Sequence, residues 1–489
     1  MAATTAQPSF LATRRGKYTL ALLCAIAFLD FVDASIVNIA LPDISKDLNF
    51  SVQGLQWVIS GYLLTYGGFM LLGGRAGDLL GRRRVLVAGT ALFAVSSLIG
   101  GFAGDAGVLV GARIAQGLGA ALMLPAALSL LTTLFKEGKD RHTALGVWGG
   151  VAGLASAAGV FLGGVLTEGP GWRWVLFVNP PIAALLFVGI FWLIPGERRR
   201  APLANFDVIG TALVTGGMLL LVFALVKAPD QGWGSGATIG ELAGAAALLA
   251  AFVDNEQRGR NPLVPLSIFR IKGLAAADVT QLIGVGGFVT MFFFLTLYMQ
   301  NVLGYSPLET GASYLPLTFG VGISAGISSQ LIGRVGTRPV IVAGALITAG
   351  GLFYLSRIPV DGSYIVDLFP GLMIVSLGIG GVFVATTTAA NAGVPADKAG
   401  LAAALVNSAQ QIGGALGLAI FSAIATSRTD HLLAGGRPVP DALTAGFHRA
   451  LLAAGIFLVG AAIIALRTKN ARGEVELPTE ETLPEPVRA

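Results

Sequence analysis

The feature that most constrains this chain is a series of about fourteen apolar runs, each roughly 20 residues long, separated by short polar turns. An α-helix rises about 1.5 Å per residue, so roughly 20 residues cross the ~30 Å hydrocarbon core of a bilayer. The runs have their centres near residues 29, 63, 94, 120, 154, 185, 218, 245, 287, 322, 347, 379, 413 and 456. Only 12% of the 489 residues are charged, about half of what a soluble domain carries. The sequence therefore predicts an all-α integral membrane protein.

The distribution of basic residues predicts the orientation of the helices. If the chain starts in the cytoplasm, most of the 32 Lys and Arg residues fall in cytoplasmic segments, as the positive-inside rule requires. The exceptions outside are Lys46, Arg173, Lys227, Arg357, Arg428, Arg437 and Arg449. The apolar run from Tyr18 to Leu41 is too long for a signal peptide and is predicted to be retained. We expect a multi-pass protein of the plasma (inner) membrane with both termini cytoplasmic and, despite a net charge of +5, no nucleic-acid partner.

An internal repeat divides the chain. The segment GRRRVLVAGT at 81–90 resembles GTRPVIVAGA at 336–345, which pairs the loop after the second span with the loop after the tenth. Two halves of six helices with two extra helices between them fit this pairing. The predicted parts are a cytoplasmic N-terminus (1–17), a first half (18–195), a linker with the extra helices (196–271), a second half (272–466) and a disordered cytoplasmic tail (467–489).

Two acidic residues, Asp30 and Asp33, lie in the first apolar run, FLDFVDASIVNIALP at 28–42. An aspartate at the centre of a membrane helix costs roughly 2.5–3.5 kcal/mol, and such residues usually face a cavity. The i, i+3 spacing puts both side chains on one helix face. Arg113 is the one basic residue within a predicted span, which makes it the natural partner of this pair. A site that exchanges Arg113 for a proton would be a carrier of protons.

Several further stretches carry a resemblance to a known family. They are GRAGDLLGRRR at 74–84, GARIAQGLGAALMLPAALSLL at 111–131, GVWGGVAGLASAAGVFLGG at 146–164 and GWRWVLFVNPP at 171–181. Together with DASIVNIALP, these stretches resemble the fourteen-span drug:proton antiporters of the major facilitator superfamily. The resemblance covers nearly the whole chain. It implies the major facilitator fold and multidrug efflux as a cause of drug resistance.

The resemblance also implies roles for particular residues. Asp33 matches the acid of the first span, Asp30 is additional, and Arg113 lies in the span 4 motif. The loop after span 2 would act as a conformational latch, through Gly74, Asp78, Gly81, Arg82 and Arg83. The second-half copy of this loop has Gly333 in place of the acid. The antiporter motif of span 5 comprises Gly153, Gly159, Gly163 and Gly164, with Val160 where the family usually has proline.

Other polar and aromatic residues within the spans are candidates for a substrate pathway. They are Asn38, Tyr62, Gln116, Tyr298, Asn407 and Gln410. Gln116 lies one turn from Arg113 and would orient it. Packing in the core or against lipid is the alternative for each aromatic residue, as it is for each glycine of the antiporter motif.

The predicted function is proton-coupled antiport that exports amphiphilic drugs or toxic compounds, cationic ones among them. A dedicated exporter of one endogenous metabolite or natural product is the alternative with the same fold, and a channel or receptor is a rival of another class. The sequence has no P-loop for ATP, no metal-ligand spacing and no nucleophile–base constellation, so neither an enzyme nor a cofactor is expected. The expected partners are a small-molecule substrate, protons and membrane lipid, with the chain acting as a monomer.

Overall fold

The structure, a computed structural model, describes residues 10–135, 139–196, 207–259, 262–395 and 398–472. Within these ranges the chain is helical, without strands, and fourteen segments are long and apolar enough to cross a membrane. The long helices are α1 (Arg14–Asp47), α3 (Trp57–Leu80), α4 (Arg82–Gly101), α5 (Ala106–Leu134), α6 (Lys139–Glu168), α8 (Asn179–Leu193), α9 (Val208–Gln231), α10 (Gly236–Arg258), α11 (Leu274–Asn301), α13 (Leu315–Val335), α14 (Thr337–Leu355), α15 (Phe369–Asn391), α16 (Ala399–Ala434) and α17 (Val439–Ala465). Each predicted centre falls in its own span, so the predicted number of spans is confirmed.

Short helical segments extend or connect the spans. They are α2 (Val52–Leu55), α7 (Trp174–Phe177), α12 (Pro307–Ser313), the 3₁₀ turns Phe10–Ala12 and Leu266–Arg270, and the π-helical turn Tyr364–Leu368. The even number of spans returns α17 to the end of the bundle at which α1 begins. We name this end the near end, and the end that holds Asp47 the far end.

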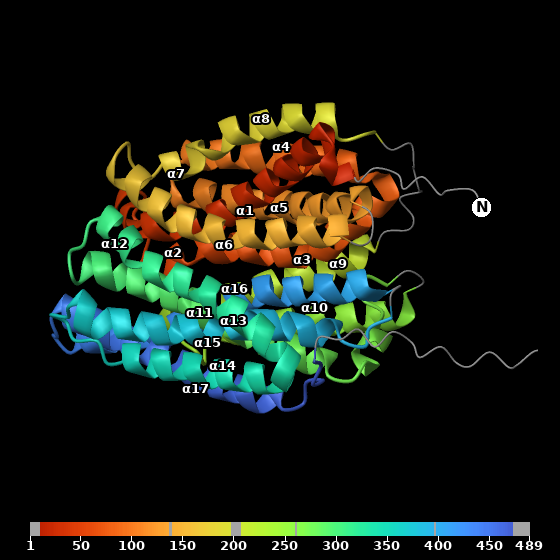
Figure 1. The fold of residues 1–489 in the computed structure, drawn as a ribbon. Coiled ribbons are helices and arrows are strands. Elements are labelled where there is room, and N and C mark those ends of the chain that lie inside the picture. The colour runs from red at the N-terminus through yellow and green to blue at the C-terminus, as the bar shows by residue number, and fades with distance from the viewer. Residues whose placement is uncertain (1–9, 136–138, 197–206, 260–261, 396–397, 473–489) are drawn as a thin grey trace, which may run out of the picture.

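The helices form two blocks that lie side by side (Figure 1). In the first block α5 packs against α3 and α4, and α6 packs along α1. In the second block α15 packs against α13 and α14, and α16 packs along α11. The extra helices α9 and α10 pack on one another, and α9 also contacts α3 and α16. The hydrophobic core runs through both blocks, from Leu20 in α1 to Ala462 in α17.

The two blocks touch from the middle of the bundle to its far end. In the middle, the Ser408 hydroxyl of α16 donates a 3.0 Å hydrogen bond to the carbonyl of Gly67 in α3. Nearer the far end, Gln300 Nε2 of α11 donates to the carbonyl of Ile39 in α1 at 2.9 Å. At the far end, the backbone N–H of Leu308 donates to Glu168 Oε2 at 3.0 Å.

The near-end halves of α6 and α13 have open space beside them. A Cβ added at Gly149 or Gly153 of α6, or at Gly326 or Gly333 of α13, would meet no atom within 4 Å among the described residues. By contrast, a Cβ on Gly164 at the far end of α6 would lie 2.8 Å from the Cα of Leu308. The far end of α6 is therefore closely packed against the second block, whereas α6 and α13 have open space beside them at the near end.

The internal repeat reappears as the same sharp turn in each block. Gly81 separates α3 from α4 with a φ of 100°, and Gly336 separates α13 from α14 with a φ of 88°. Glycine adopts such positive φ angles at little cost because it has no Cβ. These glycines open the two segments, 81–90 and 336–345, that are similar in sequence.

The first residues of the predicted tail contact the second block. The guanidinium of Arg338 donates to the Thr468 carbonyl at 3.0 and 2.7 Å. The backbone N–H of Thr337 donates to the carbonyl of Ala471 at 2.9 Å. These bonds hold the chain after α17 against the second-block turn as far as the described residues extend. Residues 473–489 of the predicted tail lie outside the described part of the chain.

Candidate functional site

The centre of the first block contains a buried ion pair between α1 and α5. Asp33 Oδ2 lies 2.6 Å from Arg113 Nη1, and their side chains are 0% and 2% exposed. Burying two charges is costly unless the pair has good geometry and further hydrogen bonds. Both Asp33 and Arg113 form further hydrogen bonds.

Two side-chain amides complete the surroundings of Asp33. Gln116 Nε2 and Asn179 Nδ2 both donate to Asp33 Oδ1, at 2.9 and 2.6 Å. Arg113 Nη1 also donates to Gln116 Oε1 at 2.7 Å, so Gln116 bridges the two charged groups. Asp33 therefore joins α1, α5 and α8 in one network.

The remainder of the Arg113 guanidinium is also occupied. Its Nε donates to the carbonyl of Val58 at 3.0 Å. Its Cζ lies 4.3 Å from the centre of the Tyr62 ring, which is a cation–π arrangement. The charge of Arg113 is thus balanced by a carboxylate, a carbonyl and an aromatic face.

Asp30, one turn before Asp33, has different partners. The hydroxyl of Tyr62 donates to its Oδ1 at 2.9 Å, and the hydroxyl of Tyr66 donates to its Oδ2 at 3.0 Å. The Tyr66 hydroxyl also meets the side chain of Gln411 on α16. Asp30 forms no ion pair within the described part of the chain. The second acid is therefore held by neutral donors, and one of these donors reaches the other block.

Three important residues of these spans were missed by the sequence analysis. Asn179 lies in the quoted stretch GWRWVLFVNPP, where an amide before an apolar helix was a usable signal. Tyr66 lies one turn beyond Tyr62 on the same helix face. Asp278 is an acid in the apolar run of α11. It is 9% exposed, and neither carboxyl oxygen has a hydrogen-bond partner among the described residues.

The predicted latch loop is tied to its own block. The Arg82 guanidinium donates to the Thr133 hydroxyl of α5. Arg83 Nη2 donates to the carbonyl of Phe191 in α8 at 3.1 Å, and its Cζ lies 4.9 Å from the Phe191 ring. Gly74 is half-buried within α3. The side chain of Asp78 lies outside what the structure describes.

The glycines of the predicted antiporter motif divide into two groups. A Cβ on Gly159 would lie 2.9 Å from the Val32 carbonyl oxygen, and one on Gly163 would lie 2.7 Å from that of Ile36. Gly164 packs against Leu308, as described above. These three positions permit the close contact of α6 with α1 and α12. Gly153 is exposed and makes no such contact.

The predicted pathway residues do not gather in one place. Tyr62 and Gln116 lie at the acid network. Asn38 and Asn407 donate to carbonyls of their own helices, those of Ala34 and Ala403, each at 3.0 Å. Gln410 is half-buried on α16. Tyr298 is fully buried, and its hydroxyl donates to the carbonyl of Pro359 rather than toward the acids.

The described residues contain no cluster of His, Cys, Asp and Glu that could hold a metal ion. What the network can do chemically is hold a carboxylate against one guanidinium in a region shielded from water. The other acid of α1 accepts hydrogen bonds from two phenols. Both acids are held so that a change of protonation would change their partners.

Comparison with known proteins gives the same fold. The family model described as Major Facilitator Superfamily matches residues 23–418. One similar solved structure is that of a bacterial homologue of the human lysosomal transporter Spinster, in an inward-facing and unoccupied conformation. The TM-score is 0.63 at 15% identity, and the match covers 93% of this chain and 97% of that one.

Two curated relatives are resistance proteins of Streptomyces species. The puromycin resistance protein pur8 of Streptomyces alboniger is 39% identical over 455 residues, which cover 92% of this chain and 90% of that protein. The tetracenomycin C resistance and export protein of Streptomyces glaucescens is 39% identical over 423 residues, which cover 86% and 76% of the two chains.

Proposed function

Because the chain belongs to the major facilitator superfamily, we propose that it is a proton-coupled antiporter that exports amphiphilic small molecules across the plasma membrane. The observation that carries the proposal is the buried network in which Asp33 is bound to Arg113, Gln116 and Asn179. An acid buried in a membrane span is retained for a function in most proteins. Here it has a single counter-ion that a proton can replace.

In the proposed cycle, Asp33 exchanges Arg113 for a proton. When the carboxylate is protonated, the ion pair loses its attraction, and Arg113 keeps only the Val58 carbonyl, the Gln116 amide and the Tyr62 ring as partners. The three helices joined at Asp33 then become free to adopt another packing. Release of the proton on the other side of the membrane restores the pair.

The second acid of α1 supports coupling between the blocks. Asp30 is connected through the Tyr66 hydroxyl to Gln411 of α16, where α3 and α16 are in close contact. A change in the hydrogen bonding of Asp30 therefore alters a contact across the block interface. We assign Asp30 the role of a second proton-binding group. In the predicted orientation, the open space at the near end of α6 and α13 faces the cytoplasm and would admit the substrate there.

The energy of one proton is sufficient for this work. A proton that moves down 100 mV yields about 2.3 kcal/mol, and each pH unit adds about 1.4 kcal/mol. A tenfold gradient of a neutral substrate requires about 1.4 kcal/mol. Two acids would allow the exchange of two protons for a divalent cation.

The relatives favour a second candidate equally. One is described as conferring puromycin resistance and the other as exporting tetracenomycin C. A dedicated exporter of one natural product would use the same fold and the same coupling network. The breadth of the substrate range separates the two candidates.

Transport into inverted membrane vesicles tests both. Ethidium, puromycin and tetracenomycin C are offered separately, with and without an imposed ΔpH, to vesicles that contain matched amounts of wild type, Asp33→Asn or Asp43→Asn. Asp43 lies further along α1 and outside the network, so it is the matched control for removing a carboxylate. We expect ΔpH to drive accumulation by wild type and the control, and a loss of at least tenfold in Asp33→Asn.

Each outcome has a definite meaning. Accumulation of several compounds supports a polyspecific exporter, and accumulation of one supports the dedicated exporter. Accumulation by wild type that ignores ΔpH would contradict proton coupling. An Asp33→Asn variant that keeps ΔpH-driven transport would remove Asp33 from the coupling role.

A further inference from the structure

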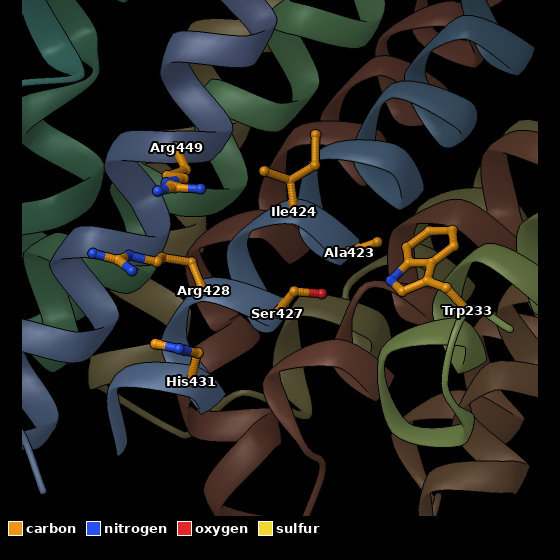
Figure 2. Close-up of a pocket in the computed structure, with 7 residues that line it drawn as sticks. All are labelled: Trp233, Ala423, Ile424, Ser427, Arg428, His431 and Arg449. Atoms are coloured by element: carbon orange, nitrogen blue, oxygen red, sulfur yellow. The ribbon is translucent and has the colours of Figure 1, made fainter. Parts of the chain in front are cut away.

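A second site lies away from the acids, at the far end of the bundle, and goes beyond the proposed function. We propose that the pocket between α16, α17 and the turn that joins α9 to α10 binds the phosphate headgroup of an anionic phospholipid from the surrounding membrane. The pocket has a volume of about 560 Å³ and is lined by Trp233, Ile424, Ser427, Arg428, His431 and Arg449 among others (Figure 2).

The charge of the pocket is the first argument. Figure 2 shows Arg428, His431 and Arg449 grouped together on α16 and α17, with Trp233 across from them. No acidic residue lines the pocket. Arg113, Arg173 and Arg258 form ion pairs, whereas neither pocket arginine forms one among the described residues. The site thus presents cationic groups without a protein counter-ion.

The neighbouring acids do not fill that role. Asp430 lies two residues after Arg428 on α16 and interacts with Asp230 of α9 as a like charge. Among the described residues, neither acid forms an ion pair with Arg428 or Arg449. A negatively charged ligand would supply the compensation that the protein does not.

The side of the membrane is the second argument. Arg428 and Arg449 belong to the few basic residues that the predicted orientation places outside, against the insertion bias. A third such residue, Arg173, is neutralised by Asp47 at 2.5 Å. The two pocket arginines have no equivalent partner, although they are near one another. A guanidinium matches a phosphate with paired N–H donors, which makes this chemistry the best fit.

The surface next to the pocket distinguishes a lipid from a free phosphate. Arg449, Leu452 and Ile456 follow an i, i+3, i+7 pattern on one face of α17. Leu452 and Ile456 are 46% and 57% exposed. Leu452 and Ile456 lie about 4.5 and about 10.5 Å beyond Arg449 along α17, away from its far-end start, so this apolar track continues from the pocket toward the middle of the bundle. A headgroup at Arg449 would place its acyl chain along Leu452 and Ile456. Trp233 at the rim is typical of the membrane interface.

The test measures the unfolding midpoint of the purified full-length protein in detergent. Phosphatidylglycerol, phosphatidylcholine or inorganic phosphate is titrated into wild type, into Arg428→Gln/Arg449→Gln and into Arg357→Gln/Arg437→Gln. The last variant removes the same charge from arginines outside the pocket at the same predicted face. We expect phosphatidylglycerol to raise the midpoint of wild type and control more than phosphatidylcholine does. In the pocket variant the half-saturating concentration should rise at least tenfold.

Three results would overturn the proposal. They are an equal response of wild type to the two lipids, an unchanged preference for phosphatidylglycerol in the pocket variant, and a response to inorganic phosphate as large as that to phosphatidylglycerol. Should the glutamine variant fail to fold, Arg428→Lys/Arg449→Lys keeps the charge and loses the paired donors. It should bind phosphatidylglycerol more weakly than wild type, and undiminished binding would also contradict the proposal.

Discussion

Asp33 and Asp30 lie one turn apart on the same face of α1 and are equally buried, at 0% and 1% exposure. Asp33 meets a guanidinium and two amides, all from its own block. Asp30 meets two phenols, one of which contacts the other block. The same residue type at the same depth is therefore compensated by a charge in one case and by neutral hydrogen bonds in the other.

Burial alone therefore does not define the role of an acid in a membrane helix. A charged partner ties the protonation of the carboxylate to the breaking of an ion pair. Neutral donors tie it to a rearrangement of hydrogen bonds. Removing one partner of a buried ion pair costs more stability than removing one neutral hydrogen bond, so changes at Asp33 should have larger effects than changes at Asp30.

The largest effect is expected from removing the cation. Arg113→Gln should reduce stability by about 3–5 kcal/mol, because it leaves the buried Asp33 carboxylate without its counter-ion. Unfolding of the detergent-solubilised protein measures this. The double variant Arg113→Gln/Asp33→Asn should recover part of the loss, since it removes both charges. If the double variant is as unstable as the sum of the two single variants, the ion pair does not couple these residues.

A smaller effect is expected from removing one amide. Asn179→Ala deletes the hydrogen bonds from Nδ2 to the charged Asp33 and to the Ser97 hydroxyl but leaves Arg113 and Gln116 in place. The expected loss of stability is about 1.5–3 kcal/mol. The same unfolding measurement tests it, with Asn38→Ala as the control, since Asn38 bonds only to its own helix within the described residues. A loss no larger than that of the control would remove Asn179 from the network.

The smallest effects on stability are expected at Tyr62 and Tyr66, whose hydroxyls donate to Asp30. Tyr62→Phe should cost about 0.5–1.5 kcal/mol, the contribution of one hydrogen bond, and Tyr66→Phe somewhat more, because the Tyr66 hydroxyl also meets Gln411. Phe at position 62 keeps an aromatic face for Arg113. Transport should fall more in Tyr66→Phe, because only Tyr66 contacts Gln411. Vesicle transport at matched protein amounts compares the two variants, and equal rates would argue against a link through Tyr66.

The sequence by itself determined the spans, the repeat and the identity of the buried charged groups. Fourteen spans follow from local hydropathy, because about 20 apolar residues suffice to mark each one. The matching segments at 81–90 and 336–345 marked the two turns at Gly81 and Gly336. Asp30, Asp33 and Arg113 stood out because charged residues are rare in apolar runs.

Only the tertiary structure decided which groups meet. The i, i+3 spacing places Asp30 and Asp33 on the same helix face. The packing of α1 against α5 and α8 brings Arg113 and Asn179 into contact with Asp33. The packing of α3 against α1 brings the hydroxyls of Tyr62 and Tyr66 into hydrogen-bond distance of Asp30, and it places Tyr66 against α16. Hydropathy is a property of consecutive residues, but a hydrogen bond between helices depends on their rotation and depth, which many distant contacts fix together. For the same reason the sequence could not show that the hydroxyl of Tyr298, a predicted pathway residue, donates to the carbonyl of Pro359.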